Sequence, residues 1–135
     1  MNVESVEVEG RTIAIIIRKS SDESGSTPFT DPRLPMQVAV HIRPAGHIAP
    51  AHFHPPAKSL SQKGRTRHEI LHLDKGSVEV GLFTRNGKHV RTVELEEGDT
   101  ILMMEGHEVI YKTNVHVLEI KEGQYPGLEK DKRLL

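Results

Sequence analysis

The chain has 135 residues, enough for one domain with a single hydrophobic core and too few for two domains of ordinary size. Basic and acidic side chains nearly balance, 18 against 19, so no general field attracts nucleic acid or an anionic membrane, and we expect neither as a partner. Cysteine is absent, which excludes disulfides and thiolate chemistry and leaves His, Asp and Glu as the strong metal ligands.

The first residues indicate where the protein works. They are acidic and lack the basic segment and apolar run of a signal peptide. Nowhere does an apolar run approach the ~20 residues that a membrane helix needs. We therefore expect a cytoplasmic protein.

Short β-branched or alternating segments, separated by turn signals, follow one another along the chain. Prolines end the third segment near residue 54, and Asn86-Gly87 is typical of a tight hairpin turn. An apolar 3.6-residue period never persists for three turns, so the pattern predicts an all-β sandwich or barrel with little helix. The predicted strands are residues 11–18, 36–43, 48–54, 67–73, 77–83, 89–95, 100–104, 107–111 and 114–121.

This pattern indicates a single domain, 1–135, with its core at about 11–121. A polar tail, 122–135, is expected to be loop-like with one helical turn in 128–133. Residues 55–64, rich in proline and small polar side chains, are expected to form a surface excursion.

One pair of histidines offers chemistry. His52 and His54 are two residues apart on a predicted strand, so their side chains project from one face as a ready pair of metal ligands. The chain has nine histidines, and two half-buried polar strand residues are the plainer alternative.

The surrounding spacing favours a metal site. Five residues separate Gly46 from His52, and six separate Glu69 from Gly76. These two halves resemble the first motif of the cupin superfamily, in which a His-x-His pair and a glutamate bind metal. Fourteen residues lie between His54 and Glu69, where the family has three or four. A loop formed by the proline-rich segment accommodates that difference.

The second cupin motif is matched less regularly. Gly98 and Gly106 are present, but Met104 and Val109 stand where the family places proline and histidine. His107 lies two residues from the family position, on the same strand face and displaced by ~7 Å along the strand. The resemblance makes His107 the fourth expected ligand, after His52, His54 and Glu69.

The resemblance implies a cupin-type double-stranded β-helix, a jelly-roll barrel with the metal in its mouth. Three imidazoles and one carboxylate suit a divalent transition metal such as Zn, Ni, Fe or Mn. The chain looks most like small single-domain bacterial cupins that largely lack an assigned activity. The matching residues are Gly106-His107, the segment 123–127 and the segment 131–134.

Three further side chains are candidates for substrate binding. Arg65, Arg67 and Glu69 alternate, so an early start of their strand would place both arginines beside the carboxylate ligand. They could then grip a substrate carboxylate or phosphate, although solvated surface arginines are the alternative. His47, in the loop before the histidine pair, is a candidate polar group of the mouth.

These features predict a metal-binding cupin that binds a small anionic or sugar-like molecule in the barrel mouth, as a metal-dependent isomerase or epimerase or as an oxygenase-type enzyme. The alternative is a non-catalytic cupin, a ligand-binding or assembly module with a degenerate metal site. Sequence alone leaves open whether the protein is an enzyme. Jelly-roll edge strands are often covered by a partner, so we expect a homodimer that pairs or exchanges the strand before Ser20.

Overall fold

A computed structural model describes residues 3–18, 25–56, 66–123 and 126–135. In these ranges the chain forms twelve strands and one helix of a single turn. The elements are β1 (Val3–Val8), β2 (Arg11–Ile17), β3 (Gly25–Pro28), β4 (Met36–Arg43), β5 (Ile48–Phe53), β6 (Glu69–Lys75), β7 (Val78–Phe83), β8 (His89–Leu95), β9 (Thr100–Met103), β10 (Gly106–Tyr111), β11 (Val115–Glu122), α1 (Leu128–Asp131) and β12 (Arg133–Leu134).

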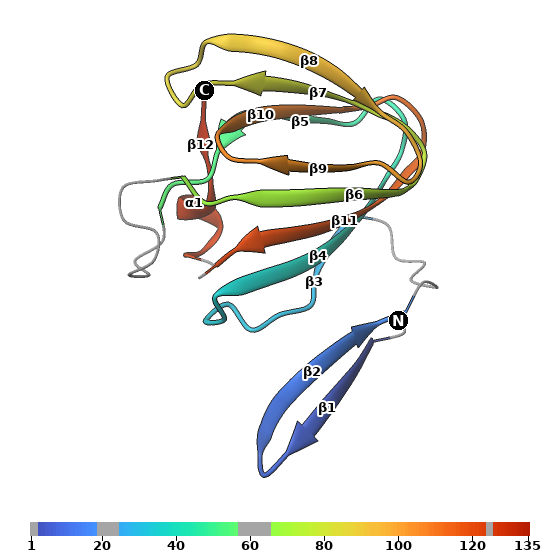
Figure 1. Cartoon of the computed structure of the whole chain (residues 1–135), viewed down its shortest axis with the longest axis vertical. Coiled ribbons are helices and arrows are strands. Elements are labelled where there is room, and N and C mark those ends of the chain that lie inside the picture. The colour runs from blue at the N-terminus through green and yellow to red at the C-terminus, as the bar shows by residue number, and fades with distance from the viewer. Residues whose placement is uncertain (1–2, 19–24, 57–65, 124–125) are drawn as a thin grey trace.

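Two five-stranded antiparallel sheets form the barrel (Figure 1). One has the strand order β12-β5-β10-β7-β8 and the other β3-β4-β11-β6-β9. Apart from the hairpins β7–β8 and β3–β4, neighbouring strands in both sheets are not consecutive in the chain, as in a jelly roll. The predicted all-β double-sheet fold is confirmed.

Side chains alternate between buried and half-buried positions along the central strands, and the buried ones form the interior. On β11, side chains 115, 117, 119 and 121 are buried while those between them are half-buried. The apolar members join one cluster drawn from both sheets, which is the hydrophobic core. Its buried residues are Leu71, Leu73, Val78, Val80, Met103, Val109, Tyr111, Val115 and Val117.

The tail has more structure than its polar sequence predicts. The expected helical turn is present as α1, but the residues after it form β12, which pairs antiparallel with β5. A two-residue strand leaves no periodicity to detect, so the loop-like prediction is wrong at this point. The tail therefore covers the outer edge of the strand that carries His52.

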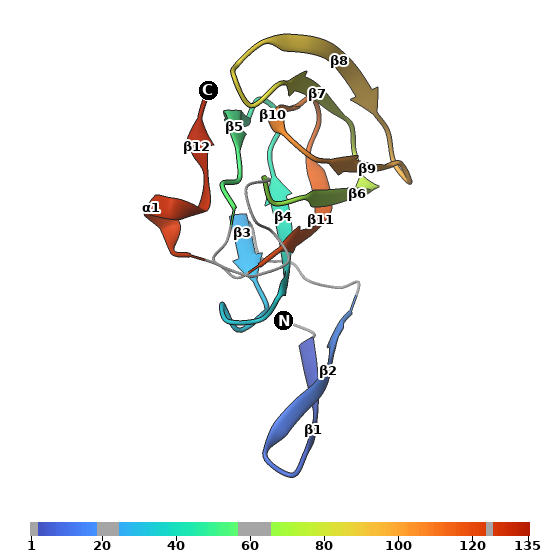
Figure 2. The ribbon, with the colours of Figure 1, turned by 60° about the vertical axis from the view of Figure 1, so that its left-hand side comes forward.

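The N-terminal segment forms a separate antiparallel hairpin. β1 and β2 are hydrogen-bonded to each other and belong to neither barrel sheet. The hairpin extends away from the barrel in both views (Figures 1 and 2). None of the helices in the described ranges is long and apolar enough to cross a membrane.

Candidate metal centre

Four side chains of the predicted ligand set meet in the barrel. One ligand atom from each of His52, His54, Glu69 and His107 lies within 4.8 Å of the others, and all four residues are buried. His52 lies near the end of β5 and His54 directly follows that strand, Glu69 begins β6, and His107 lies on β10. The cluster thus joins one sheet, which supplies the imidazoles, to the other, which supplies the carboxylate.

His107 reaches the cluster because the pairing of its strand is irregular. His107 lies directly opposite His52. Two residues further along β10, Val109 pairs with Ala49, which is three residues before His52 on β5. The additional residue in β5 is a bulge near Pro50, which shifts the register between the two strands. Direct partners on adjacent strands share a face, so the bulge aligns the two imidazoles.

Each histidine is oriented by a backbone carbonyl. The Nδ1 atoms lie 2.6 Å from the Pro50 oxygen for His52, 2.8 Å from that of Asp131 for His54 and 3.1 Å from that of Glu105 for His107. A carbonyl only accepts, so each Nδ1 carries the proton and each Nε2 is available as a ligand. Metal-binding histidines are commonly oriented in this way.

Glu69 lies between two of these rings. Its Oε2 atom is 2.8 Å from Nε2 of His54 and 3.0 Å from Nε2 of His107. Because the Nδ1–H group of each ring donates to a backbone carbonyl, the lone pair on Nε2 would face the Glu69 carboxylate. That contact is favourable only if a proton or a metal ion lies between Nε2 and the carboxylate oxygen. The donor set and its spacing therefore fit a divalent metal.

The local charges follow from this contact. Burial by itself raises the pKa of Glu69, but the charge and hydrogen bonds of His107 and His54 outweigh it and hold the pKa well below its usual value. Burial likewise lowers the pKa of His107, yet the Glu69 charge raises it overall. For His52, burial and then the His107 charge lower the pKa to about 4, so its Nε2 lone pair is available near neutral pH.

Of the candidates for substrate binding, one lines the cavity beside the cluster and another does not. His47 lines the cavity beside the cluster, and its ring packs on Tyr111 with 5.3 Å between ring centres. Arg67 does not line that cavity, because β6 begins only at Glu69 and the guanidinium turns to the tail. There it donates to the Pro55 carbonyl at 2.8 Å and pairs with the Asp131 carboxylate at 3.1 Å. Arg65 lies outside the described residues.

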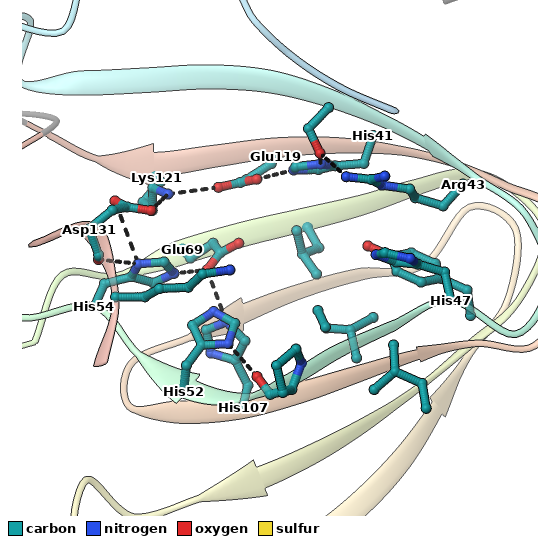
Figure 3. A pocket seen from close by; sticks show the side chains of 18 residues that line it. His41, Arg43, His47, His52, His54, Glu69, His107, Glu119, Lys121 and Asp131 are labelled. Carbon is teal, nitrogen blue, oxygen red and sulfur yellow. Dashed lines mark hydrogen bonds and ion pairs between the residues drawn. The ribbon is translucent and has the colours of Figure 1, made fainter. Parts of the chain in front are cut away.

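The cavity has a volume of about 360 Å³, and its far wall carries polar residues that the sequence did not single out. Figure 3 shows His41 and Arg43 from β4 with Glu119 and Lys121 from β11. Polar residues two apart within apolar strands, as in His41-x-Arg43 and Glu119-x-Lys121, were the signal that could have identified this wall.

The backbone geometry explains why two positions of the first motif are glycine. Gly46 and Gly76 both have positive φ, 90° and 88°, which other residues rarely adopt. At Gly76 a Cβ atom would also collide with the backbone carbonyl of Asn114. The two turns that bracket the ligand strands therefore require glycine for their shape.

Comparison with known proteins gave matches at the level of structure. The sequence matched no family model and no curated protein. A conserved protein of unknown function from Streptococcus pyogenes has a TM-score of 0.55 and 16% identity over 79% of this chain and 78% of its own. An oxalate decarboxylase variant from B. subtilis has a TM-score of 0.61 and 18% identity over 84% of this chain and 29% of its own.

The capsular polysaccharide assembling protein CapF from Staphylococcus aureus has a TM-score of 0.62 and 16% identity over 85% of this chain and 32% of its own. The chain thus spans about a third of the length of CapF and of the decarboxylase. At such low identity these likenesses concern the fold. Together with the double-sheet barrel, they show that the chain is a cupin-fold protein, as the two motifs predicted.

Proposed function

We propose that the protein is a metal-binding cupin that binds a small anionic or sugar-like molecule in the cavity beside His52, His54, Glu69 and His107, and acts on it as a metal-dependent isomerase or epimerase or as an oxygenase-type enzyme. The observation that carries the proposal is the convergence of three Nδ1-anchored imidazoles on one buried carboxylate. A divalent ion such as Zn, Ni, Fe or Mn would supply Lewis acidity toward a ligand oxygen, and iron would add the capacity to bind oxygen.

Neighbouring residues of the chain would position the ligand. Burial, followed by the negative charge of Glu119, raises the pKa of Tyr111 to about 12, so its hydroxyl keeps its proton and can donate to a ligand oxygen. The Glu119 carboxylate lines the same cavity and can only accept when ionised. A donor and an acceptor that line the same cavity suit a ligand with several oxygen atoms.

Metal analysis tests the proposal. Protein purified without chelator, then incubated separately with Zn, Ni, Fe and Mn and freed of excess ion, should retain about one ion per chain by mass spectrometry. The His52→Ala/His54→Ala double variant should retain none. His72→Ala is the matched control, because His72 lies on β6 with Glu69 but its half-exposed side chain is outside the cavity.

Absence of retained metal in the wild-type protein under all four conditions would refute the proposal. Equal retention by wild type and the double variant would move the metal to another site. Ligand binding with neither retained metal nor turnover would support the non-catalytic alternative with its degenerate metal site.

A further inference from the structure

The cavity has a second polar end opposite the metal ligands. Figure 3 shows Arg43 and His47 at the end away from His54 and His107, with the Glu119 wall between them. Lys132, from the tail, also lines the cavity. A volume of about 360 Å³ is near the lower limit for ligand pockets, so a molecule that contacts both ends is small.

Two cations that line the cavity, Arg43 at the far end (Figure 3) and Lys132 from the tail, have no ion pair among the described residues. The buried Lys121, in contrast, pairs with Glu119 and Asp131 at 3.2 and 3.0 Å. Burial lowers the pKa of His47, and the positive charges of Arg43 and Lys132 contribute to the same effect. A cation that lines a cavity and has no ion pair of its own favours an anionic ligand.

Arg43 is held in place by hydrogen bonds along the wall. Its Nη2 atom donates to Ser26 Oγ at 2.8 Å, and that oxygen lies 2.7 Å from Nδ1 of His41. A guanidinium only donates, so the Ser26 hydroxyl can direct its own proton to His41. The Nε2–H group of His41 then donates to Glu119. This sequence of donors orients Arg43 and leaves most of its N–H groups for a ligand.

Glu119 supplies an acceptor between the two ends. Glu119 is 7% exposed, and its carboxylate accepts a hydrogen bond from His41 and forms an ion pair with Lys121. An ionised carboxylate has about four acceptor positions, so capacity remains for a hydroxyl group in the cavity. The wall thus combines a place for an anion with a place for an alcohol.

We propose that the ligand is a small polyhydroxy compound with one anionic group, a carboxylate or a phosphate, which Arg43 binds together with His47 and Lys132. A hydroxyl of the compound donates to Glu119, and another oxygen faces the four metal ligands. The last contact rests on the function proposed above, whereas the anion and hydroxyl contacts depend on the protein alone.

Calorimetric titration of the full-length protein, loaded with the metal it retains, tests this inference. The probes are gluconate, glucose 6-phosphate, neutral glucose and inorganic phosphate. Gluconate and glucose 6-phosphate should bind at least tenfold more tightly than glucose, and inorganic phosphate should compete with both. Arg43→Ala should weaken both anionic probes at least tenfold, and Arg43→Lys should restore part of the affinity, with metal content unchanged in both variants. Arg91→Ala, at an exposed site on β8, should change nothing.

The inference is overturned if glucose binds as tightly as gluconate and glucose 6-phosphate, if Arg43→Ala leaves their affinity intact, or if none of the anionic probes binds. A stronger response to gluconate or to glucose 6-phosphate identifies a carboxylate or a phosphate as the anion. Metal content is measured on the same samples. Retained metal without Arg43-dependent binding refutes this inference alone, whereas Arg43-dependent binding without metal refutes the proposed function alone.

Discussion

The contact between Glu69 and His107 makes metal binding depend on pH. Imidazole binds a metal only after losing its Nε2 proton, and the Glu69 charge raises the pKa of His107 above its usual 6.5. A proton therefore competes with the metal at higher pH than at a free imidazole. Glu69 adds no such competition, because its pKa is held well below 4.5. We expect the affinity for Zn²⁺, measured against a competing chelator, to rise steadily from about pH 6 to about pH 8.

The variant His107→Gln gives the control for this prediction. It removes the raised pKa along with one ligand, so binding should be weaker at every pH and its pH dependence shallower. An affinity that is constant across this range in the wild-type protein would contradict the prediction. Apparent affinities must be corrected for protonation of the chelator before the comparison.

Individual site residues differ in how far the sequence could predict them. His52 and His54 follow from strand alternation, and Glu69 from its spacing to Gly76. The position of His107 depends on the β5 bulge, which no local pattern in β10 reveals. The predicted role of Arg67 assumed an earlier start of β6, whereas its side chain bonds to the tail, a contact 64 residues away in sequence. Such long-range contacts leave no periodicity to detect.

At the scale of elements, α1 is fixed to the barrel through one residue. The Asp131 carboxylate pairs with Arg67 and Lys121, while its backbone carbonyl accepts from Nδ1 of His54 and from Arg67. The carboxylate thus neutralises two buried cations, and the carbonyl orients a predicted metal ligand.

Asp131→Asn should separate these roles. The amide leaves the fully buried Arg67 without its anion, and breaking a buried pair costs about 3–5 kcal/mol, so the thermal midpoint should fall markedly. Metal content should be unchanged because the carbonyl is retained. Glu129→Gln, at an exposed position of the same helix, is the control and should alter neither. Loss of metal from Asp131→Asn would show that the carboxylate, and not the carbonyl, maintains His54.

At the scale of the whole molecule, the β1–β2 hairpin has no sheet partner in the described chain. Val3, Ile15 and Ile17 share one face of it, and Ile13, which is 60% exposed, lies at the register shift between Ala14 and Thr12. A hairpin alone is marginally stable in water, so an apolar face of this kind is expected to pack against another surface. The homodimer remains a prediction, and this face is where we expect the second copy.

Light scattering during size-exclusion chromatography measures the mass. The full chain should elute at twice the 15.1 kDa of one copy, and Ile15→Glu should shift it toward the monomer. Ala14→Glu places the same charge on the opposite face of β2, beside Val6, and should leave the dimer intact. A monomeric wild-type protein, or equal effects of the two variants, would refute the arrangement.

The ligands lie in both sheets, up to 55 residues apart between His52 and His107, so the centre is complete only after the sheets have assembled. Contacts that form after the transition state slow unfolding and leave the folding rate nearly unchanged. At a metal concentration of about 100 times Kd, the stabilisation is about 2.7 kcal/mol, which predicts unfolding about 100-fold slower. Stopped-flow measurements with metal and with chelator should therefore differ mainly in the unfolding rate constant. The bound metal would then stabilise the native barrel kinetically.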